Sequence, residues 1–378
     1  MRILSIVGTR PEAIKMAPII KELARYHDQV ESMVCTTGQH REMLDQMFAF
    51  FNIVPDFDLD IMRTGQIPTL VAARVLEQLD PILADLKPDW ILVQGDTTTV
   101  MAASIAAHYR RVKVGHVEAG LRTYDRQNPF PEEMNRVVTD HVSDLHFAPT
   151  TRAKENLICE GIQEHSVFVT GNTVIDALLD VVEMPPPLEI ETLLHDHSRN
   201  LILITIHRRE NHGQPLEKIC AAIRVLANRP DVHFIYAVHR NPNVWEPVHH
   251  LLGGLENVTL LPPVDYLPMV HLMQNSYLIL TDSGGIQEEA PSLGVPVLVL
   301  RHKTERPEAV EAGAVRLVGN DTDNIVTEVS HLLEDTEAHQ EMAQVINPYG
   351  DGQAAKRIVH LLLNNEALPV GIDKWQYP

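Results

Sequence analysis

Short apolar runs alternate with longer helical stretches along the whole chain. In the first half, the runs that predict strands are residues 3–7, 30–36, 90–94, 114–117 and 145–148. In the second half they are residues 201–205, 233–238, 258–261, 278–281 and 297–300. Polar turns and amphipathic stretches such as residues 11–25 separate the runs, a pattern typical of βαβ units. The sequence therefore predicts an α/β fold of doubly wound parallel sheets, whose ligands bind at the carboxyl ends of the strands.

The length of the chain predicts two domains. Its 378 residues exceed the size at which a single hydrophobic core stops growing. Met184-Pro185-Pro186-Pro187 is a stiff, proline-rich linker. We place the domain boundary between Gly171 and Pro187, and assign residues 1–171 to the first domain and 172–352 to the second.

Composition narrows the class of protein. The formal charge of −20 argues against nucleic acid or an anionic membrane as the main partner, since both require a basic surface. Cys35, Cys159 and Cys220 have neither metal-ligand spacing nor a disulfide framework, so we expect a reducing cytoplasm. We expect no signal peptide, because residues 1–8 contain no long apolar core, and no membrane span, because no apolar run approaches the length that crosses a bilayer. P-loop, Rossmann NAD and zinc motifs are absent, and we expect no metal or other cofactor.

Carboxylates follow two of the predicted strands in the first half. Asp96 and Glu118 lie just after the runs 90–94 and 114–117, and Glu132 opens a later helix. We expect these three side chains to converge at one sheet edge, where neighbouring carboxylates separate one another's pKa values and suit acid–base chemistry. The plain alternative is that each is a helix cap or a solvated acid, and this alternative is strongest for Glu132.

Cations accompany these acids. Arg10 lies in the turn after the first strand, and Lys15 is expected on the first turn of the following helix. Arg136 lies on the helix that Glu132 opens, and we include it among the substrate-binding residues.

The second half carries a glycine turn between a strand and a helix. Ser283-Gly284-Gly285 follows the run 278–281, and residues 286–293 are expected to be helical. Backbone N–H groups at such a turn attract phosphate, and Glu289 is placed to accept hydrogen bonds from a ribose. The alternative is an ordinary turn with a serine N-cap. His207, followed by two arginines at another strand end, and the segment 301–308, with Arg306, are expected to add polar groups and cations.

Taken together, the motifs of this chain resemble the bacterial non-hydrolysing UDP-N-acetylglucosamine 2-epimerase family. They are residues 8–15, 39–44, 95–99, 115–122, 131–133, 171–173, 207–211, 281–291 and 304–308. The resemblance extends from about residue 3 to about residue 360, with the motifs in the family's order.

The resemblance implies a GT-B fold, in which two Rossmann-like domains face a cleft, and a homodimer. It implies that the helix from Gln353 onward returns to the first domain. Catalytic roles fall on Asp96, Glu118, Glu132 and His207, and substrate-binding roles on Arg10, Lys15, Arg136, Ser283, Gly284, Gly285, Glu289 and Arg306. Gln39 and Gln46 match a region where some relatives are activated by their own substrate. His302-Lys303, Val264, Met269 and Gln94 depart from the family's usual residues.

The implied reaction interconverts UDP-GlcNAc and UDP-ManNAc, which supplies ManNAc for cell-surface polysaccharide. The hydrogen at carbon 2 is not next to a carbonyl, so we expect UDP to leave first, giving a 2-acetamidoglucal, and to return on the other face. Four alternatives are open: a hydrolysing epimerase, an epimerase of a related diacetamido-uronic UDP-sugar, a GT-B glycosyltransferase, and a sugar-nucleotide sensor without catalysis.

Overall fold

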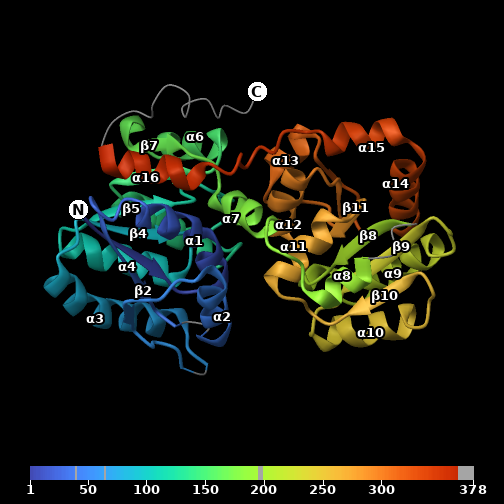
Figure 1. Ribbon diagram of the computed structural model, residues 1–378, viewed down its shortest axis with the longest axis horizontal. Helices are drawn as coiled ribbons and strands as arrows, with labels where there is room; N and C mark the ends of the chain where they lie inside the picture. Colours follow the sequence, from blue (N-terminus) through green and yellow to red (C-terminus); the bar gives the residue numbers. More distant parts are fainter. Residues whose placement is uncertain (39–40, 64, 195–198, 365–378) are drawn as a thin grey trace. The chain divides into compact units, whose positions relative to one another are not determined.

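The computed structural model describes residues 1–378 except 39–40, 64, 195–198 and 365–378. It consists of two compact units (Figure 1). The first unit contains residues 1–177 and 349–378, and the second contains residues 178–348. The chain therefore crosses from the first unit to the second after Ala177 and returns at Tyr349.

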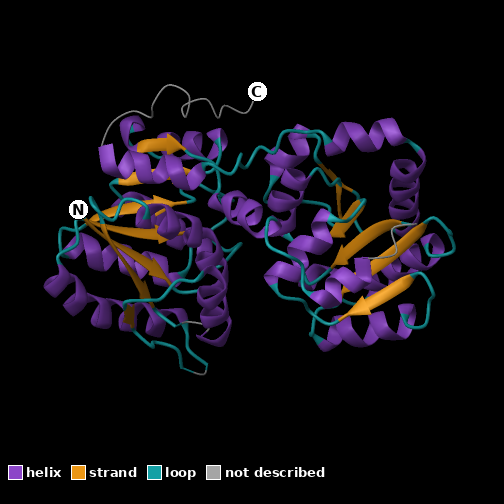
Figure 2. Ribbon diagram, viewed as in Figure 1, coloured by secondary structure: helices purple, strands orange, loops and turns teal. Residues whose placement is uncertain are grey.

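The first unit is built on a seven-stranded parallel sheet with the strand order β3-β2-β1-β4-β5-β6-β7. Figure 2 shows the strands of the molecule as orange arrows. Its strands are β1 (Arg2–Val7), β2 (Glu31–Thr36), β3 (Phe57–Asp58), β4 (Trp90–Gln94), β5 (Lys113–Val117), β6 (Leu145–Ala148) and β7 (Val167–Val169). The central strands are buried on both faces and are therefore continuous apolar runs.

Helices cover both faces of this sheet. They are α1 (Arg10–Ala24), α2 (Arg41–Phe51), α3 (Pro68–Leu86), α4 (Thr98–Tyr109), α5 (Glu132–Val142), α6 (Thr151–Cys159), the 3₁₀ turn η1 (Glu164–Ser166) and α16 (Ala354–Asn364). Helix α7 (Thr173–Val182) contains the point at which the chain passes from the first unit to the second. Leu4 and Ile6 of β1 pack with apolar side chains of α3 and α4 in one core cluster. Helix α1 packs against β1, β2 and β4, and α16 packs against α1.

The second unit is built on a six-stranded parallel sheet with the order β10-β9-β8-β11-β12-β13. Its strands are β8 (Asn200–Thr205), β9 (Val232–Ala237), β10 (Val258–Leu261), β11 (Leu278–Thr281), β12 (Val297–Val299) and β13 (Val315–Leu317). Its helices are α8 (Leu188–Leu194), η2 (Arg209–Asn211), α9 (Gln214–Leu226), α10 (Pro242–Leu252), α11 (Tyr266–Gln274), α12 (Gly284–Glu289), η3 (Ala290–Leu293), α13 (Pro307–Ala312), α14 (Thr322–Glu334) and α15 (Thr336–Ala343). Apolar side chains of α9, α10 and α14 form its main core with the sheet.

The predicted class, doubly wound parallel α/β, is confirmed, with local corrections. Helix α1 begins at Arg10, one residue earlier than expected, so Lys15 lies on its second turn and not its first. The helix expected over 286–293 already begins at Gly284 and tightens into 3₁₀ geometry at Ala290. Pro291, which lacks an N–H and cannot donate the α-helical hydrogen bond, lies at the start of that tighter turn.

Two further observations bear on ligands and surroundings. None of the helices described is both long and apolar enough to cross a bilayer. Within the described residues, no group of three or more His, Cys, Asp or Glu side chains is arranged to hold a metal ion.

Candidate active site

The carboxyl ends of β4 and β5 bring two of the predicted carboxylates to the same sheet edge. Gln94, the last residue of β4, pairs with Val117, the last residue of β5, and Asp96 and Glu118 lie just beyond. Glu118 adopts a left-handed backbone conformation with φ of 66°. This conformation is unfavourable for a residue with a long side chain, and strain of this kind is concentrated at functional sites.

Each of these two acids is paired with a cation. The Lys15 ammonium forms an ion pair with the Glu118 carboxylate, and the side chains of both are largely buried. An Arg136 guanidinium nitrogen lies 2.6 Å from a carboxylate oxygen of Asp96. The structure therefore brings together two acid–cation pairs, one from β5 and α1 and one from the β4 turn and α5.

Glu132 and Arg10 each lie at the first position of a helix. Glu132 opens α5, one turn before Arg136, and is half-buried. The neighbouring Glu133 is the fully buried acid of that turn, and it accepts the N–H groups of Thr123 and Tyr124 at 3.1 and 2.8 Å. Arg10 is the first residue of α1, just after the capping residue Thr9.

Glu12 holds the turn that precedes Arg10. Its carboxylate accepts the backbone N–H groups of Gly8 at 2.5 Å and Thr9 at 3.2 Å. Burial raises the pKa of Glu12 to about 7, because these hydrogen bonds and those from threonine hydroxyls only partly offset the loss of solvent.

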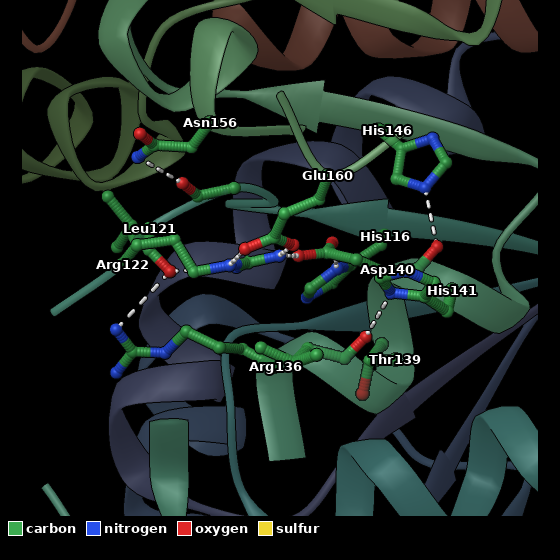
Figure 3. A network of polar contacts seen from close by, with 12 residues as sticks. His116, Leu121, Arg122, Arg136, Thr139, Asp140, His141, His146, Asn156 and Glu160 are labelled. Carbon is green, nitrogen blue, oxygen red and sulfur yellow. Dashed lines mark hydrogen bonds and ion pairs between the residues drawn. The ribbon is translucent and has the colours of Figure 1, made fainter. Parts of the chain in front are cut away.

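A buried network behind the sheet edge fixes both acid-bearing turns (Figure 3). His116 of β5 faces an Asp140 carboxylate oxygen at 2.6 Å with Nδ1, and the Gly95 carbonyl at 2.7 Å with Nε2. Both ring nitrogens thus face oxygen atoms. Because Gly95 precedes Asp96, this ring anchors the β4 turn from behind.

Arg122 completes the network from the other turn. Its guanidinium lies between two carboxylates, donating to Asp140 at 2.7 Å and to Glu160 at 2.7 and 2.8 Å (Figure 3). Burial alone would raise the pKa of Asp140, but the charge and hydrogen bond of His116 and the charge of Arg122 lower it to about 2. The sequence reasoning did not identify this network, although His116 and Arg122 lie in the quoted motif 115–122.

In the second unit, Asp282 folds the turn that carries His207. Strands β8 and β11 pair so that Thr205 lies beside Thr281, which brings His207 and Asp282 together. The Asp282 carboxylate accepts the backbone N–H groups of His207 at 3.0 Å and Arg208 at 2.9 Å, and the Asn211 side chain at 2.9 Å. His207 Nδ1 lies 3.0 Å from the same carboxylate. Burial would raise the pKa of Asp282, but these donors, with His207 foremost, hold it below its usual value.

The glycine turn follows directly. Ser283 occupies the N-cap of α12, but its side chain makes no capping hydrogen bond, so the ordinary serine-cap alternative does not describe this helix. A Cβ built on Gly284 would lie 3.7 Å from an Arg208 guanidinium nitrogen, so this cation lies beside the start of α12. Arg208 belongs to the motif 207–211, but the sequence analysis did not predict it as a site residue.

The remaining predicted residues of the second unit are buried or ion-paired. The Glu289 carboxylate is buried beside Gly285 and accepts the Tyr266 hydroxyl at 3.0 Å. Arg306 forms an ion pair with the buried Glu288. Arg301 is buried and paired with Glu210 and Glu305. The arginines of segment 301–308 are thus paired with acids, and Arg208 at the glycine turn also lies 3.5 Å from a carboxylate oxygen of Glu305.

Gln39 and Gln46 are the two residues that the resemblance matches to a region where some relatives are activated by their own substrate. Gln39 lies outside the described residues. Gln46 is exposed on α2.

The chain is similar to known proteins over almost its full length. The model of the family described as UDP-N-acetylglucosamine 2-epimerase matches residues 21–363. A UDP-N-acetylglucosamine 2-epimerase of Escherichia coli (strain K12) is 54% identical over 373 residues, which cover 97% of this chain and 99% of that protein.

Solved structures match over almost the full chain. The crystal structure of UDP-GlcNAc 2-epimerase from Neisseria meningitidis bound to UDP-GlcNAc has a TM-score of 0.87 and 50% identity, covering 97% of this chain and 100% of that one. The enzyme from Methanocaldococcus jannaschii has a TM-score of 0.83 and 35% identity, covering 96% and 99%. These matches confirm the GT-B-like fold and the predicted resemblance, and the chain belongs to the UDP-N-acetylglucosamine 2-epimerase family.

Proposed function

We propose that this epimerase interconverts UDP-GlcNAc and UDP-ManNAc by eliminating UDP and adding it back, without releasing free sugar. The observation that carries the proposal is the pair of strand-end carboxylates, Asp96 and Glu118, each held beside a cation at one sheet edge. A relative solved with UDP-GlcNAc bound supports the choice of substrate.

The two carboxylates are suited to moving the proton at carbon 2. Departure of UDP from carbon 1 develops positive charge on the sugar, which makes the hydrogen at carbon 2 acidic. One carboxylate then takes that proton, and the intermediate is a 2-acetamidoglucal. Return of a proton to the other face, with UDP re-adding at carbon 1, gives the epimer. Lys15 and Arg136 hold the acids in place, and Glu132 is assigned a supporting role at the same edge.

The leaving diphosphate requires donors and positive charge, because it gains negative charge as the bond breaks. We assign this role to Ser283, Gly284 and Gly285 with His207 and Arg208, and we assign the ribose to Glu289. Arg10 and Arg306 are proposed to contact the substrate as well. The open α12 start and the Arg208 guanidinium beside it support this assignment.

Isotopes test the mechanism directly. In heavy water, deuterium should appear at carbon 2 of both UDP-sugars, and an oxygen label in the bridging position of UDP-GlcNAc should scramble to non-bridging positions. Retention of the bridging label through many turnovers would mean that the carbon–oxygen bond never breaks. Accumulation of free ManNAc and UDP would instead identify a hydrolysing enzyme.

We also propose a cytoplasmic homodimer. The thiols of Cys35, Cys159 and Cys220 are all free, which is consistent with a reducing compartment. Light scattering of the purified protein at micromolar concentration tests the dimer, and a monomer mass would contradict it.

A further inference from the structure

Asn172 lies in the turn between β7 and α7, and both its backbone and its side chain make hydrogen bonds. The side chain is buried, with the whole residue 2% exposed. Its backbone N–H donates to the Tyr349 carbonyl at 2.7 Å. Its side-chain oxygen accepts the Val174 N–H at 3.1 Å, which caps α7, and its Nδ2 donates to Glu118 Oε2 at 3.0 Å.

These partners determine which way the amide points. An N–H donor requires the amide oxygen, and a carboxylate requires the amide nitrogen, so the two contacts are satisfied only in this orientation. Glu118 Oε2 therefore receives both the Lys15 ammonium and the Asn172 amide. Donors to a carboxylate favour its ionised form and restrict its rotation.

The segment 349–357, which follows the return of the chain to the first unit, holds the loop around Asn172. The Tyr349 carbonyl accepts its N–H, and a Cβ on Gly350 would lie 3.5 Å from backbone atoms of Asn172. Arg357 donates to the Thr170 carbonyl at 3.1 Å and pairs with Asp351 at 2.7 Å. All of these residues belong to the first unit.

We propose that Asn172 is a positioning residue for Glu118, and that the segment 349–357 sets its position. The inference rests on the proposed function, because it takes Glu118 to be one of the groups that move the proton. The amide keeps the carboxylate ionised and aimed between turnovers, while Lys15 supplies the charge. Residues close to the end of the chain thereby determine the geometry of a catalytic side chain more than 230 residues earlier in the sequence.

Two substitutions separate this role from the helix cap. Asn172→Asp preserves shape and cap but directs an oxygen at Glu118, which places two carboxylates in contact. We expect kcat to fall by about tenfold or more with KM little changed, and the acid limb of the kcat/KM profile to move to higher pH by about one unit. Asn172→Ser keeps a capping hydroxyl and removes only the donor, so kcat should fall by a smaller factor without the same shift of the limb. Asn228→Asp, which adds the same charge at an exposed position of the second unit, is the matched control and should leave the profile unchanged.

Carboxyl ¹³C titration of glutamate-labelled, ligand-free protein tests the contact without catalysis. The Glu118 resonance, assigned from Glu118→Gln, should titrate at higher pH in Asn172→Asp than in the native protein. If this resonance does not move and Asn172→Ser retains native kcat, the proposal is overturned. If the resonance moves but the catalytic limb does not, the positioning role in catalysis is overturned while the contact stands. Native activity in Glu118→Gln would instead overturn the proposed function itself.

Discussion

The two units contain a strand–turn–helix segment with the same order of residue types but opposite arrangements. In the first unit, β4 leads through Asp96 and Thr97 into α4. In the second, β11 leads through Asp282 and Ser283 into α12. Each turn thus consists of an acid followed by a hydroxyl residue at the helix N-cap.

The side chains take different directions in the two turns. Thr97 caps α4 by accepting the Val100 N–H at 3.3 Å, and the Asp96 side chain is 31% exposed beside Arg136. Asp282 is fully buried and holds the loop after the neighbouring strand β8, whereas Ser283 makes no side-chain capping bond. In the first turn a side chain caps the helix, and the carboxylate is presented to solvent. In the second turn the carboxylate is buried, and the helix start is open, that is, without a side-chain cap.

We propose that this difference separates the two tasks of the reaction. A presented carboxylate suits proton transfer, and an open helix start beside a guanidinium suits an anion. A residue type at the end of a strand therefore does not determine its chemistry. The chemistry of such a residue depends on whether a side chain accepts the N–H groups at the helix start, and on whether the acid already accepts hydrogen bonds from a loop.

The largest expected effect is at the presented acid. Asp96→Asn should lower the epimerisation rate about 10²- to 10⁴-fold, because the amide cannot exchange a proton. UDP affinity should stay near native, since the nucleotide is assigned to the second unit. Deuterium incorporation at carbon 2 and calorimetry with UDP measure the two quantities, and Asp85→Asn, on the exposed face of α3, is the control. A native rate would remove Asp96 from the catalytic residues.

The second largest effect is expected on the stability of the protein when the buried acid Asp282 is replaced. Asp282→Asn should lower the free energy of unfolding by roughly 2–4 kcal/mol, because an amide cannot accept all the donors around this position. The folded pKa of Asp282 lies below its usual value, so its contribution is complete above the unfolded pKa and is lost as pH falls through the folded one. The difference between native and variant protein in urea unfolding should therefore shrink between about pH 5 and pH 3.

Glu337→Gln, at an exposed position of α15, serves as the control and should change stability by less than about 0.5 kcal/mol. Equal losses in Asp282→Asn and this control would mean that Asp282 does not fold its turn.

How well a strand or a site residue can be predicted depends on how far apart in the sequence the interacting residues lie. The strands β4, β5 and β11 were predicted because buried central strands are continuous apolar runs, and Asp96 and Glu118 were singled out because they lie just after two of those runs. The resemblance to a family supplied the individual roles. Short edge strands such as β3 and β13 contain too few apolar residues to form a recognisable apolar run.

Residues whose role depends on distant partners were missed. Asp140 lies on a helix 24 residues from His116 and 18 from Arg122, and nothing in its local sequence indicates that it joins them. Asn172 contacts Glu118 across 54 residues. The spacing of residues indicates which side chains end strands, but long-range pairing decides which of them touch.

A smaller effect is expected at the proposed ribose contact. Glu289→Ala should weaken UDP binding by roughly 1–3 kcal/mol, because it removes the acceptor assigned to the ribose. The carboxylate also accepts the Tyr266 hydroxyl, so Tyr266→Phe is the control for that internal contact and should change affinity less. Calorimetry with UDP decides, and unchanged affinity in a folded Glu289→Ala protein would exclude Glu289 from the nucleotide site.

The smallest effect addresses the comparison of the two turns directly. Thr97→Ala removes a working N-cap and should lower the free energy of unfolding by about 1 kcal/mol, with UDP affinity unchanged. Ser283→Ala removes a hydroxyl that caps nothing, so stability should change by less than about 0.5 kcal/mol while UDP affinity falls. Urea unfolding and UDP calorimetry on both variants give four values whose pattern is opposite in the two turns. Equal losses of stability would mean that Ser283 caps α12 after all, and the proposed distinction between a closed and an open helix start would be wrong.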